Sequence, residues 1–172
     1  MGPDGAIIMS IFVAVWWLVG TKVSGYGSVP IYAVPILVTS LIVLAALRLR
    51  SGNPASPEES ARRGRLVGIA SAAEGLLILV AVNVLANTGT REFTAPVISI
   101  IVGLHFIPLA RWLPAKLYYA SATFLLATGA GGLWVHGEHI RTFYVSLAAA
   151  CILWFTSVIV LRNARDLVVN LG

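Results

Sequence analysis

Residues 65–88 read RLVGIASAAEGLLILVAVNVLANT, and this stretch decides the class of fold. A helix needs about 20 mostly apolar residues to cross the hydrocarbon core of a bilayer. After Arg65 at its start, the only charged residue in the stretch is Glu74. The stretch is therefore predicted to be a transmembrane helix that carries one carboxyl group at a depth where water is scarce.

The composition of the whole chain also indicates a membrane protein. Of its 172 residues, 58% are hydrophobic and 11% are charged, whereas soluble domains carry about 25% charged residues. A soluble protein of this size cannot bury so much apolar surface. We therefore expect an all-α fold, a polytopic transmembrane bundle of about six helices that forms a single domain over residues 1–172.

Six apolar segments are long enough, or nearly long enough, to span a bilayer. The predicted spans are 6–22, 29–49, 65–88, 95–112, 115–134 and 142–161. Residues 50–64, which are rich in Pro, Gly, Ser and charged residues, are predicted to be a cytoplasmic linker. Because Ser56 followed by Pro57 is typical of a helix start, we expect the third helix to begin before it enters the membrane.

The basic residues predict the orientation of these spans. With six spans, one side of the membrane holds Arg48, Arg50, Arg62, Arg63, Arg65, Arg111, Lys116, Arg162 and Arg165, and the other holds Lys22, Arg91 and Arg141. Basic residues collect in cytoplasmic loops, so both termini are predicted to be cytoplasmic. The net charge of +5 is thus information about topology, and no nucleic acid partner is expected.

Glu74 is the only acidic residue well inside a predicted span. A carboxylate there costs several kcal/mol unless it is protonated, paired or hydrated. One interpretation is a site for a proton or a cation. The alternative is a neutral carboxyl group that hydrogen-bonds to a neighbouring helix and holds the bundle together.

His105 is the only histidine within a predicted span. Glu74 lies nine residues from Arg65, and His105 lies six residues from Arg111. At about 1.5 Å per residue their depths differ by only about 4–5 Å. A contact between Glu74 and His105 is therefore feasible, and such a pair can relay a proton near neutral pH. The alternative is a histidine that donates to a backbone carbonyl freed by Pro108.

Asn83 and Asn87 extend the polarity of the third span towards its far end. Their angular offset from Glu74 is about 180–220° at about 100° per residue. A helix that is polar on two faces predicts a central place in the bundle or a place at a subunit interface, so a homo-oligomer is one expected arrangement. The predicted ligand or ion pathway consists of Glu74, His105, Asn83, Asn87 and Ser71.

The loop after the fifth span contains His136, Glu138 and His139, whose side chains are suitable metal ligands. The zinc-protease pattern His-Glu-x-x-His is absent, and a polar loop at the membrane surface is the simpler interpretation. No set of nucleophile, base and acid is recognisable, so the sequence does not favour an enzyme and leaves any cofactor unknown.

Three segments carry a resemblance to known proteins. Residues 73–77 (AEGLL), 83–89 (NVLANTG) and 101–111 (IVGLHFIPLAR) are similar to small bacterial multi-pass membrane proteins of uncharacterised function. The resemblance covers about a quarter of the chain. It implies a prokaryotic inner membrane and brings no activity with it.

Two functional hypotheses follow. The leading hypothesis is a small transporter- or channel-like protein that moves protons or a small ion or solute through an internal polar site. The alternative is a non-catalytic binding or assembly protein, whose intramembrane polar residues only hold helices or subunits together. The expected partners are the lipid bilayer, a proton or small ion, and further copies of the chain.

Overall fold

The computed structural model describes residues 3–25, 29–50, 57–113 and 116–169. These ranges form six α-helices and one short 3-10 helix, and they contain no strand. The elements are α1 (Pro3–Ser24), α2 (Val29–Arg50), α3 (Pro57–Asn87), η1 (Arg91–Phe93), α4 (Thr94–Trp112), α5 (Leu117–Trp134) and α6 (Glu138–Val169). The predicted all-α fold is therefore confirmed.

Five helices in the described ranges are long and apolar enough to cross a membrane. Their apolar parts are Gly5–Ser24, Ile31–Leu49, Ala61–Asn87, Arg91–Trp112 and Glu138–Asp166, and they coincide with five of the six predicted spans. The chain is thus a membrane protein by length and composition of its helices. The first residues of α3 lie within the predicted linker, which is therefore helical from Pro57 onwards.

The sixth predicted span, 115–134, forms α5, which is not among these five. Tyr, Ser, Thr and Gly residues keep the mean hydropathy of α5 below that of these five spans. Its 18 residues extend about 27 Å at about 1.5 Å per residue, close to the thickness of a bilayer core of about 30 Å. Its length therefore suits a spanning helix, and it buries Tyr118 and Ser121 against neighbouring helices.

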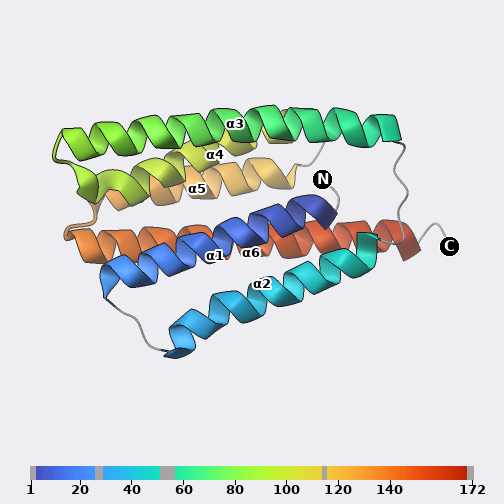
Figure 1. The fold of residues 1–172 in the computed structure, drawn as a ribbon, viewed down its shortest axis with the longest axis horizontal. Helices are drawn as coiled ribbons and strands as arrows, with labels where there is room; N and C mark the ends of the chain where they lie inside the picture. The colour runs from blue at the N-terminus through green and yellow to red at the C-terminus, as the bar shows by residue number, and fades with distance from the viewer. Residues whose placement is uncertain (1–2, 26–28, 51–56, 114–115, 170–172) are drawn as a thin grey trace.

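Successive helices run in alternate directions along the long axis of the molecule (Figure 1). One end, here called the basic end, is where α1 and α3 begin and where α4 and α6 end. It holds Arg48, Arg62, Arg63, Arg65, Arg111, Lys116, Arg162 and Arg165. The opposite end holds Lys22, Arg91 and Arg141. The alternation places the cationic residues unequally at the two ends, as the charge pattern predicts.

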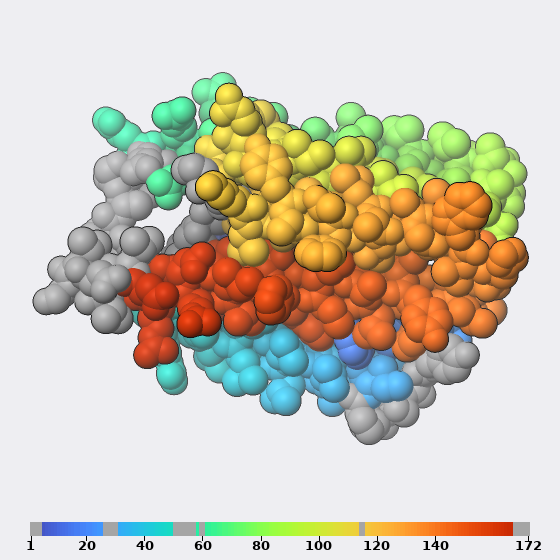
Figure 2. All heavy atoms as spheres, turned by 180° about the vertical axis from the view of Figure 1, so that it is seen from behind, coloured from blue at the N-terminus to red at the C-terminus, as the bar shows by residue number. Residues whose placement is uncertain are grey.

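Two groups of helices meet on α6. α1 packs against α2 and α6, whereas α3 packs against α4, and both α4 and α5 pack against α6. Figure 1 shows α3, α4 and α5 above α6, α1 crossing in front of α6, and α2 below. Seen from behind, α5 lies alongside α6 (Figure 2). α6 is therefore the main link between the two groups.

Small residues and hydroxyl groups hold α4, α5 and α6 together. The Oγ of Ser99 on α4 donates to the carbonyl oxygen of Leu125 on α5 over 2.9 Å. The hydroxyl groups of Ser121 on α5 and Thr156 on α6 lie 2.7 Å apart. A Cβ on Gly103 would come within 3.0 Å of the backbone nitrogen of Leu126. Close approach and interhelical hydrogen bonds are how helices associate in lipid, where apolar burial gives little advantage.

The structure corrects the expectation that the third helix is central. α3 lies at the edge of the bundle with α4 as its main packing partner. Most of its residues are exposed, and Gly64 and Gly68 face open space. A narrow stripe that includes Val67, Ala70 and Glu74 faces the rest of the protein. The alternative expectation, that α3 lies at a subunit interface, stays a prediction.

Candidate functional site

Glu74 on α3 faces His105 on α4. The Nδ1 atom of His105 lies 3.6 Å from Oε2 of Glu74, and the two side chains are 10% and 11% exposed. The contact between Glu74 and His105, which their similar depths in the membrane made feasible, is therefore present. The separation is only about 0.4–0.9 Å longer than an ordinary hydrogen bond of about 2.7–3.2 Å. A small side-chain movement is enough for the two groups to share a proton.

Helical spacing and aromatic packing fix the position of this pair. Ala70 and Glu74 are one turn apart on α3, so they share the face that packs on α4. Next to His105, the ring of Phe106 lies edge-on at 5.9 Å. Phe106 in turn packs against Tyr118 of α5 at 5.6 Å. The imidazole is thus held on a face of α4 that α3 and α5 both support.

Ser71, Glu74 and His105 line the same small cavity of about 50 Å³. On its other side the cavity is lined by α1, through residues that include Phe12 and Trp16. One water molecule needs about 10–15 Å³ of such space, so the cavity has room for a few waters or a small ion. Three of the five residues of the predicted pathway are therefore brought together.

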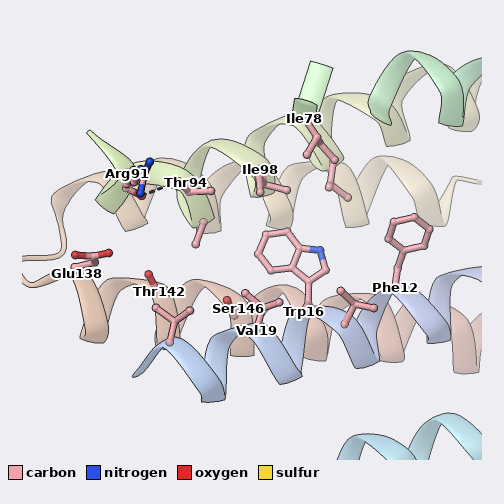
Figure 3. A pocket seen from close by; sticks show the side chains of 14 residues that line it. Phe12, Trp16, Val19, Ile78, Arg91, Thr94, Ile98, Glu138, Thr142 and Ser146 are labelled. Carbon is pink, nitrogen blue, oxygen red and sulfur yellow. Dashed lines mark hydrogen bonds between the residues drawn. The ribbon is translucent and has the colours of Figure 1, made fainter. Parts of the chain in front are cut away.

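A larger cavity of about 390 Å³ adjoins the small one, on the side that lies away from the basic end. Phe12, Trp16 and Val102 line both cavities. Figure 3 shows the indole ring of Trp16 standing between α1 and α4 in this space. We call the two cavities together the α1–α4 groove. At the opposite end its lining becomes polar, with side chains of η1, α4 and α6: Arg91, Thr94, Glu138 and Thr142.

Asn83 and Asn87 do not line this groove, so the structure does not bring them together with Glu74 and His105. Both are exposed, and they line a shallow hollow on the outward face of α3. The Nδ2 of Asn83 donates to the carbonyl oxygen of Leu79 over 2.8 Å, and that of Asn87 donates to Asn83 over 2.9 Å. Because carbonyl groups of the same helix satisfy these amides, they need no place inside the bundle.

His136, Glu138 and His139 do not form the metal site that their spacing suggested. Among the described residues no group of three or more His, Cys, Asp or Glu side chains is arranged to hold a metal ion. The Nδ1 of His139 lies 2.7 Å from the carbonyl oxygen of Val23 on α1. Glu138 lines the α1–α4 groove. The loop therefore connects α6 to α1 and contributes a carboxylate to the groove.

Arg141 has a role that sequence reasoning missed. The residue is buried, with 6% of its surface exposed. The guanidinium donates to the carboxylate of Glu92 over 3.1 Å and to the carbonyl oxygen of Glu92 over 3.2 Å. It also donates to the carbonyl oxygen of Val135 over 2.8 Å. The guanidinium carbon also lies 4.3 Å from the ring centre of Phe93. These contacts fix η1 on the start of α6. The sequence signal for this contact was the position of its two residues. Glu92 lies just before the predicted span 95–112 and Arg141 just before 142–161, on the same predicted side of the membrane.

Comparison of the chain with family models, with curated proteins and with solved structures finds no match. The resemblance of residues 73–77, 83–89 and 101–111 to bacterial membrane proteins therefore stays an expectation. The geometry of the α1–α4 groove and of the Glu74–His105 contact carries the functional inference.

Proposed function

We propose that this chain is a small membrane transport protein in which Glu74 and His105 bind a proton or a small cation. The observation that carries the proposal is the 3.6 Å approach of the two side chains beside a cavity with room for water. Ionisable residues inside a membrane usually mark the path of an ion or a proton relay.

The charge of the pair favours occupancy by one monovalent ion. With Glu74 ionised and His105 neutral, the pair carries one negative charge in surroundings of low dielectric constant. A bound proton or monovalent cation removes that net charge, and the low dielectric constant favours the neutral state. The hydroxyl of Ser71, in the same cavity, adds an oxygen ligand. Within the pair, a proton moves from one side chain to the other without changing the net charge.

The course of the α1–α4 groove suits a path along the bundle. The small cavity extends towards the basic end, where Gly5 and Leu109 line it. The large cavity extends towards the opposite end, where Arg91 and Glu138 line it. Phe12, Trp16 and Val102 line both cavities, so the two parts adjoin in the middle of the bundle. Polar residues near both ends of one continuous groove support a path along the bundle.

The proposed setting is the inner membrane of a bacterium. The basic end faces the cytoplasm in this proposal, because Lys and Arg collect in cytoplasmic loops. α5 is then the sixth span, and both ends of the described chain lie on the cytoplasmic side. The similarity of residues 73–77, 83–89 and 101–111 to bacterial membrane proteins supports this setting.

Flux through purified protein in liposomes tests the proposal. An inward proton or K⁺ gradient is imposed, and the internal pH or the membrane potential is followed by fluorescence. We expect flux from the wild type and its loss in Glu74→Gln and His105→Ala. Glu58→Gln and His136→Ala change the same residue types at exposed positions, so they keep the flux. Equal flux in all five proteins, or none in the wild type, overturns the proposal.

The outward face of α3 favours a second candidate function, which is assembly with another copy of the chain. Asn83 and Asn87 each donate to their own helix, and each side-chain oxygen is still able to accept a hydrogen bond. An amide is self-complementary, since it has both a donor and an acceptor, so two copies of this face can pair. We expect a dimer in liposomes by single-molecule photobleaching, which the double variant Asn83→Leu/Asn87→Leu dissociates. Val80→Leu on the same face is the control. An unchanged distribution contradicts this function.

A further inference from the structure

The larger cavity of the α1–α4 groove has an apolar wall that opens along its side. Its volume of about 390 Å³ lies in the range of about 300–1,000 Å³ that is typical of small-molecule sites. Phe12, Val15 and Val19 of α1 line it and are 51%, 53% and 49% exposed. Because these half-exposed residues lie within a predicted span, the cavity opens to the hydrocarbon core. Its occupant therefore enters from the lipid and is largely apolar.

The rim of the cavity at the opposite end carries two separate charges. Arg91 and Glu138 both line it and are exposed. No ion pair joins their side chains, although Arg141 and Glu92 nearby form one at 3.1 Å. Figure 3 shows Arg91 and Glu138 on different sides of the mouth. A guanidinium suits a phosphate and a carboxylate suits an ammonium group. The mouth therefore matches a head group that carries both charges.

Buried hydroxyl groups face the cavity below this rim. Thr142, one turn along α6 from Glu138, is 8% exposed, and its hydroxyl makes no hydrogen bond within the described part of the chain. In Figure 3 this hydroxyl points from α6 into the cavity. Thr156 and Ser157, further along the same helix, instead donate to Ile152 and Leu153. Because it lines the cavity, the hydroxyl of Thr142 is able to donate to an acceptor on an occupant.

Ser146 extends this pattern deeper into the groove. It is 1% exposed, and its Oγ also has no hydrogen-bond partner. It lines the cavity where Gly20 of α1 packs directly against it. The order along α6 from the rim inwards is thus a carboxylate and then two hydroxyl-bearing residues, and the apolar side chains of α1 and α4 line the rest of the cavity. Head group, ester oxygens and acyl chain follow in the same order in a glycerophospholipid.

We propose that the larger cavity binds a zwitterionic bilayer phospholipid, with its phosphate at Arg91, its ammonium group at Glu138, an ester oxygen at Thr142 and one acyl chain along α1. The site goes beyond the proposed function, because none of its polar contacts involves Glu74 or His105. It shares the larger cavity with the outer part of the proposed path, so a bound lipid has to leave before an ion passes. Lipid binding by a protein without ion flux would overturn the transport proposal alone. Ion flux without lipid binding would overturn this proposal alone.

Native mass spectrometry of the full chain with added lipid tests the proposal. The probes are phosphatidylethanolamine, which is zwitterionic, and phosphatidylglycerol, which is anionic. We expect one tightly bound phosphatidylethanolamine per chain and about tenfold weaker binding of phosphatidylglycerol, as for the loss of one charge contact. Equal affinities for the two lipids, or no bound lipid, overturn the proposal.

Variants then locate the bound lipid. Val19→Trp fills the cavity from an exposed position, and we expect it to weaken phosphatidylethanolamine binding about tenfold or more. Leu79→Trp places the same side chain on the outward face of α3, where Leu79 is 60% exposed, and leaves binding unchanged. Arg91→Gln and Glu138→Gln each weaken binding, whereas Lys22→Gln does not. If Val19→Trp and Leu79→Trp act alike, the lipid lies elsewhere and the proposal fails. The same holds if Val15→Cys, in a chain that also carries Cys151→Ala, cross-links two chains, because a second copy then covers the groove.

Discussion

Gly129 of α5 lies directly against the main chain of Pro96 on α4, so close that a Cβ on Gly129 would come within 2.7 Å of the Pro96 carbonyl oxygen. Gly129→Ala therefore forces the two helices apart, at a cost of about 1–3 kcal/mol for overpacking. We expect a lower unfolding temperature in detergent by circular dichroism. Gly131→Ala is the control, because a Cβ there meets nothing within 4 Å. Equal unfolding temperatures for the two variants would contradict this packing.

Arg141 anchors η1 to α6 through a guanidinium group that a lysine cannot replace. The guanidinium donates in three directions and lies over the Phe93 ring, whereas an ammonium group has neither this planar fork nor this reach. We expect Arg141→Lys to destabilise the protein by about 1–3 kcal/mol. Glu92→Gln costs less, because Glu92 is 45% exposed and the carbonyl oxygens stay in place. Arg162→Lys, at an exposed position, is neutral. The measurement is thermal unfolding, and no difference between Arg141→Lys and Arg162→Lys would refute the anchoring role.

The hydroxyl groups of Ser121 and Thr156 are predicted to couple α5 to α6. They lie 2.7 Å apart, and Thr156 also lies 2.7 Å from the Ile152 carbonyl oxygen, to which it donates. Interhelical hydrogen bonds in membranes contribute about 0.6 kcal/mol on average. A double-mutant cycle with Ser121→Ala and Thr156→Val is expected to give a coupling energy of about that size. Additive effects would mean that the contact contributes nothing to stability.

Six spans require Lys116 and His136 to lie on different sides of the membrane, because they flank α5. We expect a membrane-impermeant maleimide to label His136→Cys in intact cells and Lys116→Cys only after permeabilisation. Cys151 is first replaced by Ala in both. Lys22→Cys and Arg162→Cys mark the two sides. Labelling of both α5 positions from one side would exclude α5 as a span.

The sequence predicted those features that depend on depth in the membrane. Helix positions and the alternation of the basic residues follow from the length of apolar runs and from the cost of charge in lipid. The meeting of Glu74 and His105 follows too, because a short connection between α3 and α4 makes equal distance from one end nearly equal depth. These predictions do not depend on which face of each helix packs against the rest of the protein.

The sequence could not predict which faces turn inwards. Helices that are apolar all round have no preferred side, because lipid and protein interior are similar solvents for Leu or Val. The role of α1 as a wall of the groove was therefore invisible. Asn83 and Asn87 misled for a related reason. Their amides indicated an interior position, yet bonds to carbonyl groups one turn earlier let them lie on the outward face of α3.

The position of α6 between the two groups of helices has a consequence for biogenesis. α1 and α2 pack together, and α3, α4 and α5 form a second group, but both groups attach chiefly to α6. During synthesis the two groups enter the membrane before the segment that unites them. Until α6 has been inserted, α1 and α4, which both line the groove, have no main packing partner in common. The groove is thus completed only when α6 is inserted, and lipid molecules have access to both α1 and α4 before that step.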